Sequence, residues 1–501
     1  MINKDDSHDF PAPGKFPFTA GIHEEMYRGK KWSIKQYAGY GNAKESNLYF
    51  KQLIRSGSSG ISIAFDLPTQ MGLDPTSSLA MHERGKVGVS ISNLNDMRKL
   101  LDGIDLTKIS TSMTINSTAA ILLLMYQIVA EEQGFNPLTL RGTIQNDIIK
   151  EFITRSTYIF PPRESLRLTC DIFEYCTKEL PAWNPISVSG YHFAEAGATP
   201  ALELAFAVSN GLTYLNLAKD RGLDVEKIAE KFTFFFCAKT NLIEEIAKFR
   251  AARKIWATLL KKNYNFNNAR ALKMRIHAQT AGSQLTASGI NNNYTRITLQ
   301  ALAAVLGGVQ SLHTNAVNEA LSIPTDTSSK QAINIQHILI EETDLLSYVD
   351  PISGSYIFEE LTLKIENEVY AILNEIEDLG GVVSCLESEF QRKLIEKNAF
   401  EEACLISTNK KGIVGINRGL VLEDDNLDSA NYFKKTNQDE HNDTYSHSNP
   451  LNQSDFQILK ESARSQSNIL YPIKDLILKG ASVAQITEIL KSCWGQFGLD
   501  F

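Results

Sequence analysis

The feature that most constrains this fold is an alternation, repeated eight times, of a short strand-like run with a helix-length stretch. The intervening stretches are amphipathic, as in AAILLLMYQIVAEEQG and LIEEIAKFRAARKIWATLL. Strands that alternate with helices pair in parallel, and eight such units predict an α/β fold, the (β/α)8 TIM barrel. The predicted strands are 60–66, 86–92, 108–115, 142–147, 185–190, 232–238, 273–280 and 308–315.

A second feature concerns the strand face that would line the barrel. Side chains along a strand alternate between its two faces, so residues two apart share a face. Ordinary barrels fill their interior with bulky Val, Ile and Leu, but here one face of many strands is small or polar. Such a polar tube must hold water or a long, thin, polar ligand. The alternative, that this face looks outward beneath the helices, is disfavoured because helix-covered faces are normally apolar. The face comprises Ser62, Ala64, Ser110, Ser112, Thr114, Thr143, Gln145, Ser187, Ser189, Arg275, His277 and Gln279.

The composition changes along the chain and predicts its domain organisation. Gly480 is placed to end a helix, and Ser482 with Gln485 can form a capping box for the next one. The predicted parts are an extended N-terminal arm (1–27), the barrel (28–355), a helical extension (356–423), a polar linker (424–455) and a C-terminal helical tail (456–501).

Charge and motif content exclude several function classes. The 501 residues carry a net charge of −8, and their lysines and arginines form no long block, which argues against nucleic-acid binding. No apolar run is long enough to span a membrane, and the N-terminus lacks the apolar core of a signal peptide. The six cysteines show no CxxC pairing, which is typical of free thiols in a reducing compartment, so we expect a cytoplasmic protein. Neither a phosphate-binding G-x-x-x-x-G-K-[ST] nor an H-E-x-x-H zinc motif occurs.

The stretch SGYHFAEAG places His192 just after a predicted strand, between Gly190 and Gly197. A lone histidine is more often a satisfied core residue than a ligand-binding one. Active sites of barrels, however, lie at the carboxyl ends of their strands. We therefore expect His192 to face a ligand.

Seven motifs now form a recognisable set, in chain order from Met26 to about residue 420. They are RGKKWSIKQYAGYG, ISIAFDLPTQMG, TSMTIN, GTIQNDIIKEF, SGYHFAEAG, RIHAQTAG and QSLHTNAVNEA. Together they resemble the large, substrate-binding subunit of the adenosylcobalamin-dependent methylmalonyl-CoA mutase family, the acyl-CoA mutases. In that family a coenzyme A thioester threads its pantetheine through the barrel axis, in agreement with the polar tube inferred above.

One part of the family pattern is missing. The family's cobalamin-binding domain carries a D-x-H-x-x-G motif whose histidine ligates cobalt, and none of the nine histidines here fits it. The resemblance therefore implies a separate small cobalamin-binding subunit and a hetero-oligomer, with a chaperone GTPase as a further candidate partner. It implies no metal ligand in this chain, because cobalt would arrive with its cofactor.

The resemblance gives three residues catalytic roles. His192 would donate a hydrogen bond to the thioester carbonyl as that group migrates. Tyr37 would stack over the reacting part of the substrate and help to displace the adenosyl group; by itself it is more often a packing residue. Arg155 would fork onto a free carboxylate of the acyl group, as in methylmalonyl-CoA; the alternative is a surface arginine at a helix end.

Several positions bear on the substrate. The family has glutamine at position 155 in forms that act on isobutyryl or 2-hydroxyisobutyryl groups, and Ala64 lacks the aspartate of the 2-hydroxyisobutyryl type. Gln70 and Met71, in contrast, replace the His and Arg usual in methylmalonyl enzymes, where branched-acyl relatives carry an uncharged pair.

The remaining candidate residues also follow from the resemblance. Lysine replaces a common family arginine at positions 30, 35 and 231, which keeps the charge but loses the fork. The adenosyl group would contact Tyr191, Glu195, Asn315 and Glu319. The acyl-CoA would contact Met26, Lys30, Ser33, Lys35, Ser62, Ser112, Thr114, Thr143, Gln145, Lys231, Thr233, Arg275, His277, Gln279, Gln310 and Ser311.

The sequence thus predicts an isomerase that interconverts (R)-methylmalonyl-CoA and succinyl-CoA with adenosylcobalamin. One alternative is a mutase for another branched acyl-CoA, such as isobutyryl-, 2-hydroxyisobutyryl- or ethylmalonyl-CoA. The other is a catalytically silent partner subunit that binds acyl-CoA. The presence of Tyr37, Arg155 and His192 speaks against a silent subunit.

Overall fold

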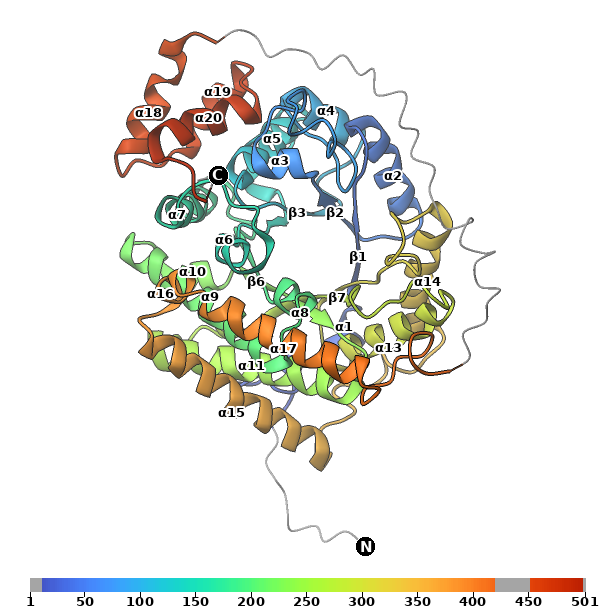
Figure 1. Ribbon diagram of the computed structural model, residues 1–501. Coiled ribbons are helices and arrows are strands. Elements are labelled where there is room, and N and C mark those ends of the chain that lie inside the picture. Colours follow the sequence, from blue (N-terminus) through green and yellow to red (C-terminus); the bar gives the residue numbers. More distant parts are fainter. Residues whose placement is uncertain (1–10, 420–450, 499–501) are drawn as a thin grey trace, which may run out of the picture. The chain divides into compact units, whose positions relative to one another are not determined.

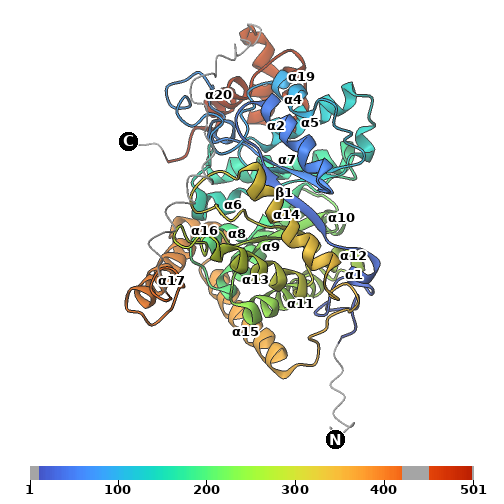
Figure 2. The same ribbon diagram turned by 90° about the vertical axis from the view of Figure 1, so that its right-hand side faces the viewer.

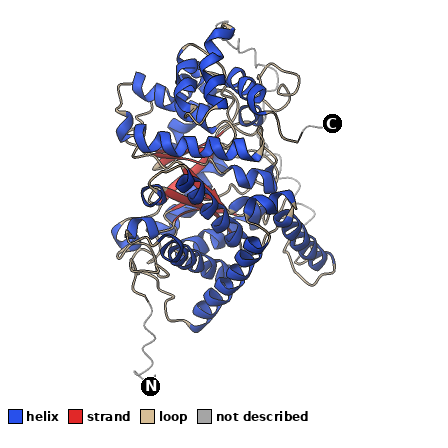
Figure 3. Ribbon diagram, turned by 90° about the vertical axis from the view of Figure 1, so that its left-hand side faces the viewer, coloured by secondary structure: helices blue, strands red, loops and turns tan. Residues whose placement is uncertain are grey.

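A computed structural model describes residues 11–419 and 451–498. Among these residues eight strands form one sheet, in the order β4-β3-β2-β1-β8-β7-β6-β5, and the paired neighbours run parallel. This order, with helices around the strands (Figure 3), is that of a nearly closed (β/α)8 barrel and confirms the predicted fold class. The strands are β1 (Ser33–Ala38), β2 (Gly60–Ala64), β3 (Ser110–Thr114), β4 (Gly142–Ile144), β5 (Ile186–Ser189), β6 (Phe232–Ala238), β7 (Arg275–Thr280) and β8 (Ser311–His313).

Helices make up most of the rest. In the part of the chain that the structure describes, none of them is long and apolar enough to cross a membrane. Their bounds are α1 (Met26–Gly29), α2 (Ala43–Arg55), α3 (Leu67–Met71), α4 (Leu94–Leu101), α5 (Ala119–Glu132), η1 (Pro137–Thr139), α6 (Ile148–Lys150), η2 (Glu151–Arg155), α7 (Pro162–Glu179), α8 (Tyr191–Glu195), α9 (Pro200–Asp220), α10 (Val225–Ala229), α11 (Leu242–Tyr264), α12 (Ala269–Leu272), α13 (Asn292–Leu306), α14 (Asp326–Glu341), α15 (Tyr356–Asp378), α16 (Val382–Glu387), α17 (Phe390–Ser407), η5 (Gln453–Phe456), α18 (Gln457–Arg464), α19 (Leu470–Leu478) and α20 (Val483–Trp494).

The strand predicted at 86–92 is wrong. This segment meets β2 only through an isolated parallel bridge between Phe65 and Val89. Gly88 has φ 130°, and a Cβ there would lie 2.3 Å from the carbonyl carbon of Phe65. The backbone therefore passes too close to the end of β2 for a regular strand at this point.

The eighth strand is instead β1, which the sequence analysis did not predict. Its apolar residues are interrupted by Lys35 and Gln36, and lysine is depleted in strands. The pairing with β2 and β8 supplies what the local sequence lacks. The number of strands was thus predicted correctly, but one member of the set was not.

The chain divides by packing into two compact units. Unit 1 comprises Met1–Ile34, Ser189–Gly211 and Thr233–Lys434. Unit 2 comprises Lys35–Val188, Leu212–Phe232 and Lys435–Phe501.

In unit 1 the helices predicted after the barrel are present as α15, α16 and α17. Figure 2 shows α15 near α11, and salt bridges join the two: Arg250 Nη2 lies 2.6 Å from Glu359 Oε1, and Lys254 Nζ lies 2.5 Å from Glu366 Oε2. The linker predicted at 424–455 lies outside the described residues up to position 450. The boundaries of the predicted domains stay predictions.

In unit 2 the C-terminal helices pack on α5 and α7 (Figure 1). Arg167 of α7 donates hydrogen bonds to the backbone carbonyls of Ser462 and Ala463, at 2.7 and 2.6 Å. The helix signals predicted for this tail are confirmed. Gly480 follows α19 with φ 99°, and Ser482 and Gln485 form the capping box of α20.

The two faces differ in burial in β1, β3 and the first half of β7, whereas β2 is buried throughout. In β1 and β3 every second residue is buried, and the polar residues between them, such as Ser110, Ser112 and Thr114, are only half-buried. The same alternation marks the first half of β7, where Arg275 and His277 are half-buried. The polar face of these strands is therefore not closely packed.

Candidate active site

A row of candidate side chains crosses four strands of unit 2. The parallel register pairs Tyr37 with Ser62, Ser62 with Ser112, and Ser112 with Thr143. Directly paired residues of a parallel sheet point to the same face. Tyr37 and the three hydroxyl residues thus lie side by side on the polar face.

Lys35 lies two residues before Tyr37 on this face. Its Nζ donates to Ser110 Oγ and to Ser112 Oγ, both at 3.2 Å. The ammonium group is thereby directed along the polar face and not into the helices. Thr114 ends β3 as a half-buried residue on the same face.

Arg155 lies at the end of a π-helical turn, Glu151–Arg155, that follows β4. Asn116, just after β3, fixes the start of this region because its Oδ1 accepts a hydrogen bond from Asp147 N at 2.9 Å. The Arg155 side chain is 30% exposed, and its Nη2 donates to Gln70 Oε1 at 3.2 Å. Arg155 therefore lies at a helix end, as the alternative interpretation expected, and its side chain also contacts Gln70.

Behind Arg155 lies a buried polar network. Lys150 pairs with Glu151, and both side chains are fully buried. Glu151 also accepts hydrogen bonds from Asn116 Nδ2 and from Thr157 Oγ1. Gln145, a predicted substrate residue, is buried and accepts from Asn116 Nδ2 at 3.0 Å.

His192 is held at the end of β5 in unit 1. The chain turns at Gly190, where a Cβ would lie 2.6 Å from Phe236 Cδ1, so only glycine fits between the strand and α8. Ser189 Oγ lies 2.7 Å from His192 Nδ1. If Nδ1 accepts the Ser189 hydroxyl, the ring carries its proton on Nε2, which is the donor that the predicted role needs.

Aromatic rings surround His192. Tyr191 stacks on Phe235 with centroids 4.6 Å apart, and His192 meets the same phenylalanine edge-on at 5.9 Å. The register pairs Phe235 with His277 and His277 with Ser311, whose Oγ lies 2.8 Å from His277 Nδ1. Two candidate histidines therefore share one aromatic wall.

The residues predicted to hold the adenosyl group also gather in unit 1. Gln279 Nε2 donates to Tyr191 Oη and to Asn315 Oδ1, each at 3.0 Å. Glu195 accepts hydrogen bonds from Ser283 N, at 3.0 Å, and from Gly282 N, at 3.1 Å.

Gly282 lies at the centre of this group. A Cβ there would lie 3.3 Å from both Asn315 Nδ2 and Glu195 Oε2, and 3.5 Å from Glu319 Cγ. The missing side chain leaves a cradle bordered by the Asn315 amide, the Glu195 carboxylate and the Glu319 methylene group. Such a donor and acceptor set fits the hydroxyl groups of a sugar.

The other predicted residues have various environments. Met26 is buried, Lys30 is exposed, and Ser33 and Lys231 are half-buried. Thr233 pairs in register with Arg275. Gln310 uses its amide on the backbone, accepting from Ile276 N and donating to Gly308 O, both at 2.8 Å.

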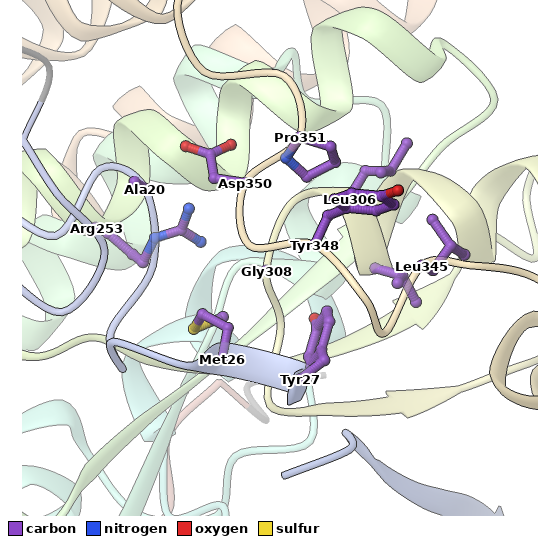
Figure 4. A pocket seen from close by; sticks show the side chains of 11 residues that line it. Ala20, Met26, Tyr27, Arg253, Leu306, Gly308, Leu345, Tyr348, Asp350 and Pro351 are labelled. Carbon is purple, nitrogen blue, oxygen red and sulfur yellow. The ribbon is translucent and has the colours of Figure 1, made fainter. Parts of the chain in front are cut away.

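A small pocket in unit 1 involves only one of these residues. Met26 lines it together with Tyr27, Tyr348 and Asp350 (Figure 4). The buried Arg253 beside them donates to the carbonyl of Phe18 at 2.9 Å and to that of Thr19 at 2.7 Å. This pocket is thus part of the anchoring of the N-terminal segment.

Some functional neighbours were not predicted. Phe235 shares its strand face with Thr233, and the period-two pattern of FTFFFCA could have indicated it. The contacts of Lys150 and Glu151 depend on the turn after β4, which has no local sequence signal. The described residues contain no cluster of three or more His, Cys, Asp or Glu that could hold a metal ion.

Comparison with known proteins identifies the family. The family description "Methylmalonyl-CoA mutase" matches residues 2–496. A 2-hydroxyisobutanoyl-CoA mutase large subunit of Aquincola tertiaricarbonis is 39% identical over 98% of this chain and 88% of its own length. The methylmalonyl-CoA mutase of Escherichia coli K12 is 41% identical over 83% of this chain, which covers 58% of that protein. The human mitochondrial methylmalonyl-CoA mutase is 38% identical over 99% of this chain and 67% of its own length. The chain therefore belongs to the methylmalonyl-CoA mutase family of acyl-CoA mutases.

Proposed function

We propose that this chain is the large subunit of a two-component, adenosylcobalamin-dependent mutase that interconverts methylmalonyl-CoA and succinyl-CoA. The observation that carries the substrate choice is the environment of Arg155. Its guanidinium keeps an exposed edge, and among the described residues its hydrogen bond goes only to the neutral amide of Gln70. A cation held in this way favours an acyl group that brings its own carboxylate.

The polar face of unit 2 suits the narrow part of the substrate. The pantetheine arm of coenzyme A carries amide and hydroxyl groups that need partners once they leave water. The hydroxyls of Ser62, Ser112 and Thr143 and the Lys35 ammonium offer such partners in consecutive rows.

His192 suits the migrating thioester. Its ring is fixed by Ser189 and by the edge of Phe235, so a proton on Nε2 has a defined direction. A donor that is already oriented stabilises charge that develops on the carbonyl oxygen without reorganisation. Tyr37 would cover the reacting carbons from the polar face of β1.

The cradle around Gly282 fits the ribose of an adenosyl group, with Asn315, Glu195 and Glu319 as partners of its hydroxyls. Adenosylcobalamin, when bound, supplies the radical chemistry that a carbon-skeleton rearrangement requires. The 501 residues contain no D-x-H-x-x-G sequence that would hold the cobalt of the cofactor. We therefore assign that part of the cofactor to a separate small subunit. A chaperone GTPase and a cytoplasmic location stay predictions.

The second candidate is a 2-hydroxyisobutyryl-CoA mutase. It is favoured by the relative from Aquincola tertiaricarbonis, a large subunit that this chain matches over 88% of its length. Gln70 and Met71 also lean toward the branched-acyl pattern. Arg155 and Ala64 point the other way.

The test is an assay of the purified chain with and without a cobalamin-binding small subunit. Methylmalonyl-, isobutyryl- and 2-hydroxyisobutyryl-CoA are compared side by side. We expect no turnover and no tight cobalamin binding by the chain alone, and the fastest turnover with methylmalonyl-CoA once the small subunit is added. Cobalamin absorbance that co-elutes with the isolated chain would contradict the two-component arrangement. Preference for either substrate without a free carboxylate would contradict the first candidate, and preference for 2-hydroxyisobutyryl-CoA would support the second.

A further inference from the structure

We propose that Gln70 is the positioning residue that sets the preference of this site for a charged or an uncharged acyl group. It acts by holding the Arg155 guanidinium in place without neutralising it. The inference rests on the proposed role of Arg155 in the function above and adds the residue that controls it.

The Gln70 amide has a defined orientation. Gln70 lies in α3, which is capped by the side chain of Asp66. Its Nε2 donates to the carbonyl of Phe65 at 2.6 Å, so its Oε1 is the atom that faces Arg155 Nη2 at 3.2 Å. The reverse orientation would place an N–H group against the guanidinium and an oxygen against a carbonyl, and both contacts would be lost.

The carboxylate that lies within 4.0 Å of Arg155 in the described part of the chain is already paired. Glu151 Oε2 lies 4.0 Å from Arg155 Nε. The same carboxylate pairs with Lys150 and accepts hydrogen bonds from Asn116 and Thr157. Lys150 balances its charge in a fully buried pair, so Glu151 serves Arg155 as a support and only weakly as a counter-ion.

The side chain at position 70 therefore determines whether the Arg155 charge is available to a substrate carboxylate. A neutral amide takes one N–H of the guanidinium and leaves its charge for a substrate carboxylate. A glutamate of the same shape would supply that carboxylate from the protein and would compete with the substrate. A leucine would keep the volume but release the guanidinium. Residue 70 thus selects for or against dicarboxylic acyl groups without touching the reacting carbons.

The test measures binding, which needs neither cobalamin nor a second subunit. The probes are two unreactive thioethers of coenzyme A, 3-carboxypropyl-CoA and butyl-CoA, which differ only in a carboxylate against a methyl group. Their dissociation constants for the full chain are measured by calorimetry. The variants are Gln70→Glu, Gln70→Leu, Arg155→Gln and the double variant Gln70→Leu/Arg155→Gln. Gln133→Glu, at an exposed glutamine of unit 2, is the control for an added negative charge.

We expect Gln70→Glu to weaken 3-carboxypropyl-CoA by about 10–100-fold, and Gln70→Leu by about 5–10-fold. Butyl-CoA should change by less than about threefold in every variant, which also reports that the chain is folded. In the Arg155→Gln background the Gln70→Leu change should have no further effect, because the residue acts through Arg155. The Gln133→Glu variant should bind both probes like wild type.

The outcomes separate this inference from the proposed function. If wild type binds the two probes equally, the carboxylate-binding role of Arg155 fails. If wild type prefers the carboxylate and Arg155→Gln removes that preference, but Gln70→Glu and Gln70→Leu both keep it, the function stands and the role of Gln70 is overturned. A Gln70→Leu effect that persists in the Arg155→Gln background would show direct contact with the ligand and would also overturn it.

Discussion

Each unit buries a lysine behind one of the candidate catalytic side chains, and the two lysines have opposite settings. In unit 1, Lys248 pairs with Glu203 and Glu245, each at 2.7 Å, and Glu203 contacts the space beside Gly190, two residues before His192. In unit 2, Lys150 pairs with Glu151, and Arg155 follows four residues after that glutamate. The side chains of both clusters are at most 1% exposed: Lys248, Glu203 and Glu245 in unit 1, and Lys150 and Glu151 in unit 2.

The surroundings move the pKa of the two lysines in different directions. Burial lowers the pKa of Lys248, but Glu203 and Glu245 outweigh it and hold the pKa above the usual range. Burial dominates for Lys150, where Glu151 opposes it and the nearby Arg155 charge adds to it, so the pKa is lowered. In the first cluster Lys248 pairs with Glu203 and Glu245. In the second, Glu151 pairs with Lys150 and also lies 4.0 Å from Arg155. We infer that the buried charges of unit 1 fix the backbone turn at Gly190, and that those of unit 2 hold the Arg155 guanidinium in place for a ligand.

The largest expected effect is on stability. Lys248→Ala would leave two carboxylates buried side by side, and Lys150→Ala would leave one. Removing one partner of a buried pair costs about 3–5 kcal/mol of unfolding free energy, with Lys248→Ala at the upper end. Chemical denaturation of the full chain, followed by circular dichroism, gives the shifts, and Lys364→Ala at an exposed lysine is the control. A larger loss for Lys150→Ala would reverse the comparison.

The two lysine variants also differ in what they do to ligand choice. Without Lys150, the Glu151 carboxylate is available to Arg155, so the preference for 3-carboxypropyl-CoA over butyl-CoA should fall. Lys248→Ala should leave that preference unchanged, since its partners lie in unit 1 near Gly190. Equal loss of preference in both variants would show that it reports only general destabilisation.

The next effect concerns His192, the proposed hydrogen-bond donor of unit 1. His192→Ala should lower turnover of the reconstituted enzyme by about 10²–10³, which corresponds to loss of one oriented donor to a developing oxyanion, with a smaller effect on KM. His337→Ala, on α14, is the matched control. Unchanged turnover in His192→Ala would remove this residue from the mechanism and leave Arg155 as the main determinant.

The sequence alone predicts the fold class of this chain but not every strand of its sheet. The fold class follows from the alternation of strands and helices, because eight parallel units have few other arrangements. The error at 86–92 arose because an apolar alternating run can be a short crossing segment, and only the close approach of Gly88 to Phe65 distinguishes the two. β1 was missed because its pairing partners, and not its own residues, make it a strand.

The candidate site was predictable to different depths in the two units. Single residues at strand ends, such as His192 and Tyr37, follow from motif position. The contact between Gln70 and Arg155 joins residues 85 positions apart, and it depends on a π-helical turn that no local pattern indicates. Partners such as Asn116 and Thr157 are ordinary polar residues whose role comes only from their place around Glu151.

A smaller effect distinguishes the roles of Arg155 in unit 2 and His192 in unit 1 by substrate. Arg155→Gln should lower kcat/KM for methylmalonyl-CoA by about 10–100-fold, because a charge-assisted, forked contact is replaced by a neutral one. Turnover of isobutyryl-CoA should rise, because a cation no longer faces the methyl group of that substrate. His192→Ala should depress both substrates equally, so the ratio of the two activities distinguishes recognition from catalysis. If wild type already prefers isobutyryl-CoA, the arginine interpretation is wrong.

The smallest effect tests how His192 is held. Ser189 is fully buried, and its hydroxyl lies 2.7 Å from His192 Nδ1. Ser189→Ala removes about 1 kcal/mol of hydrogen bonding, which is about fivefold in a rate. The ring would keep its contact with Phe235 but lose its hydrogen bond with Ser189, so kcat should fall while KM stays constant. Ser209→Ala, which also deletes a buried hydroxyl bonded within unit 1, should change neither quantity. A kcat that matches wild type would mean that the Ser189 hydrogen bond does not position His192 and that the aromatic contact is sufficient.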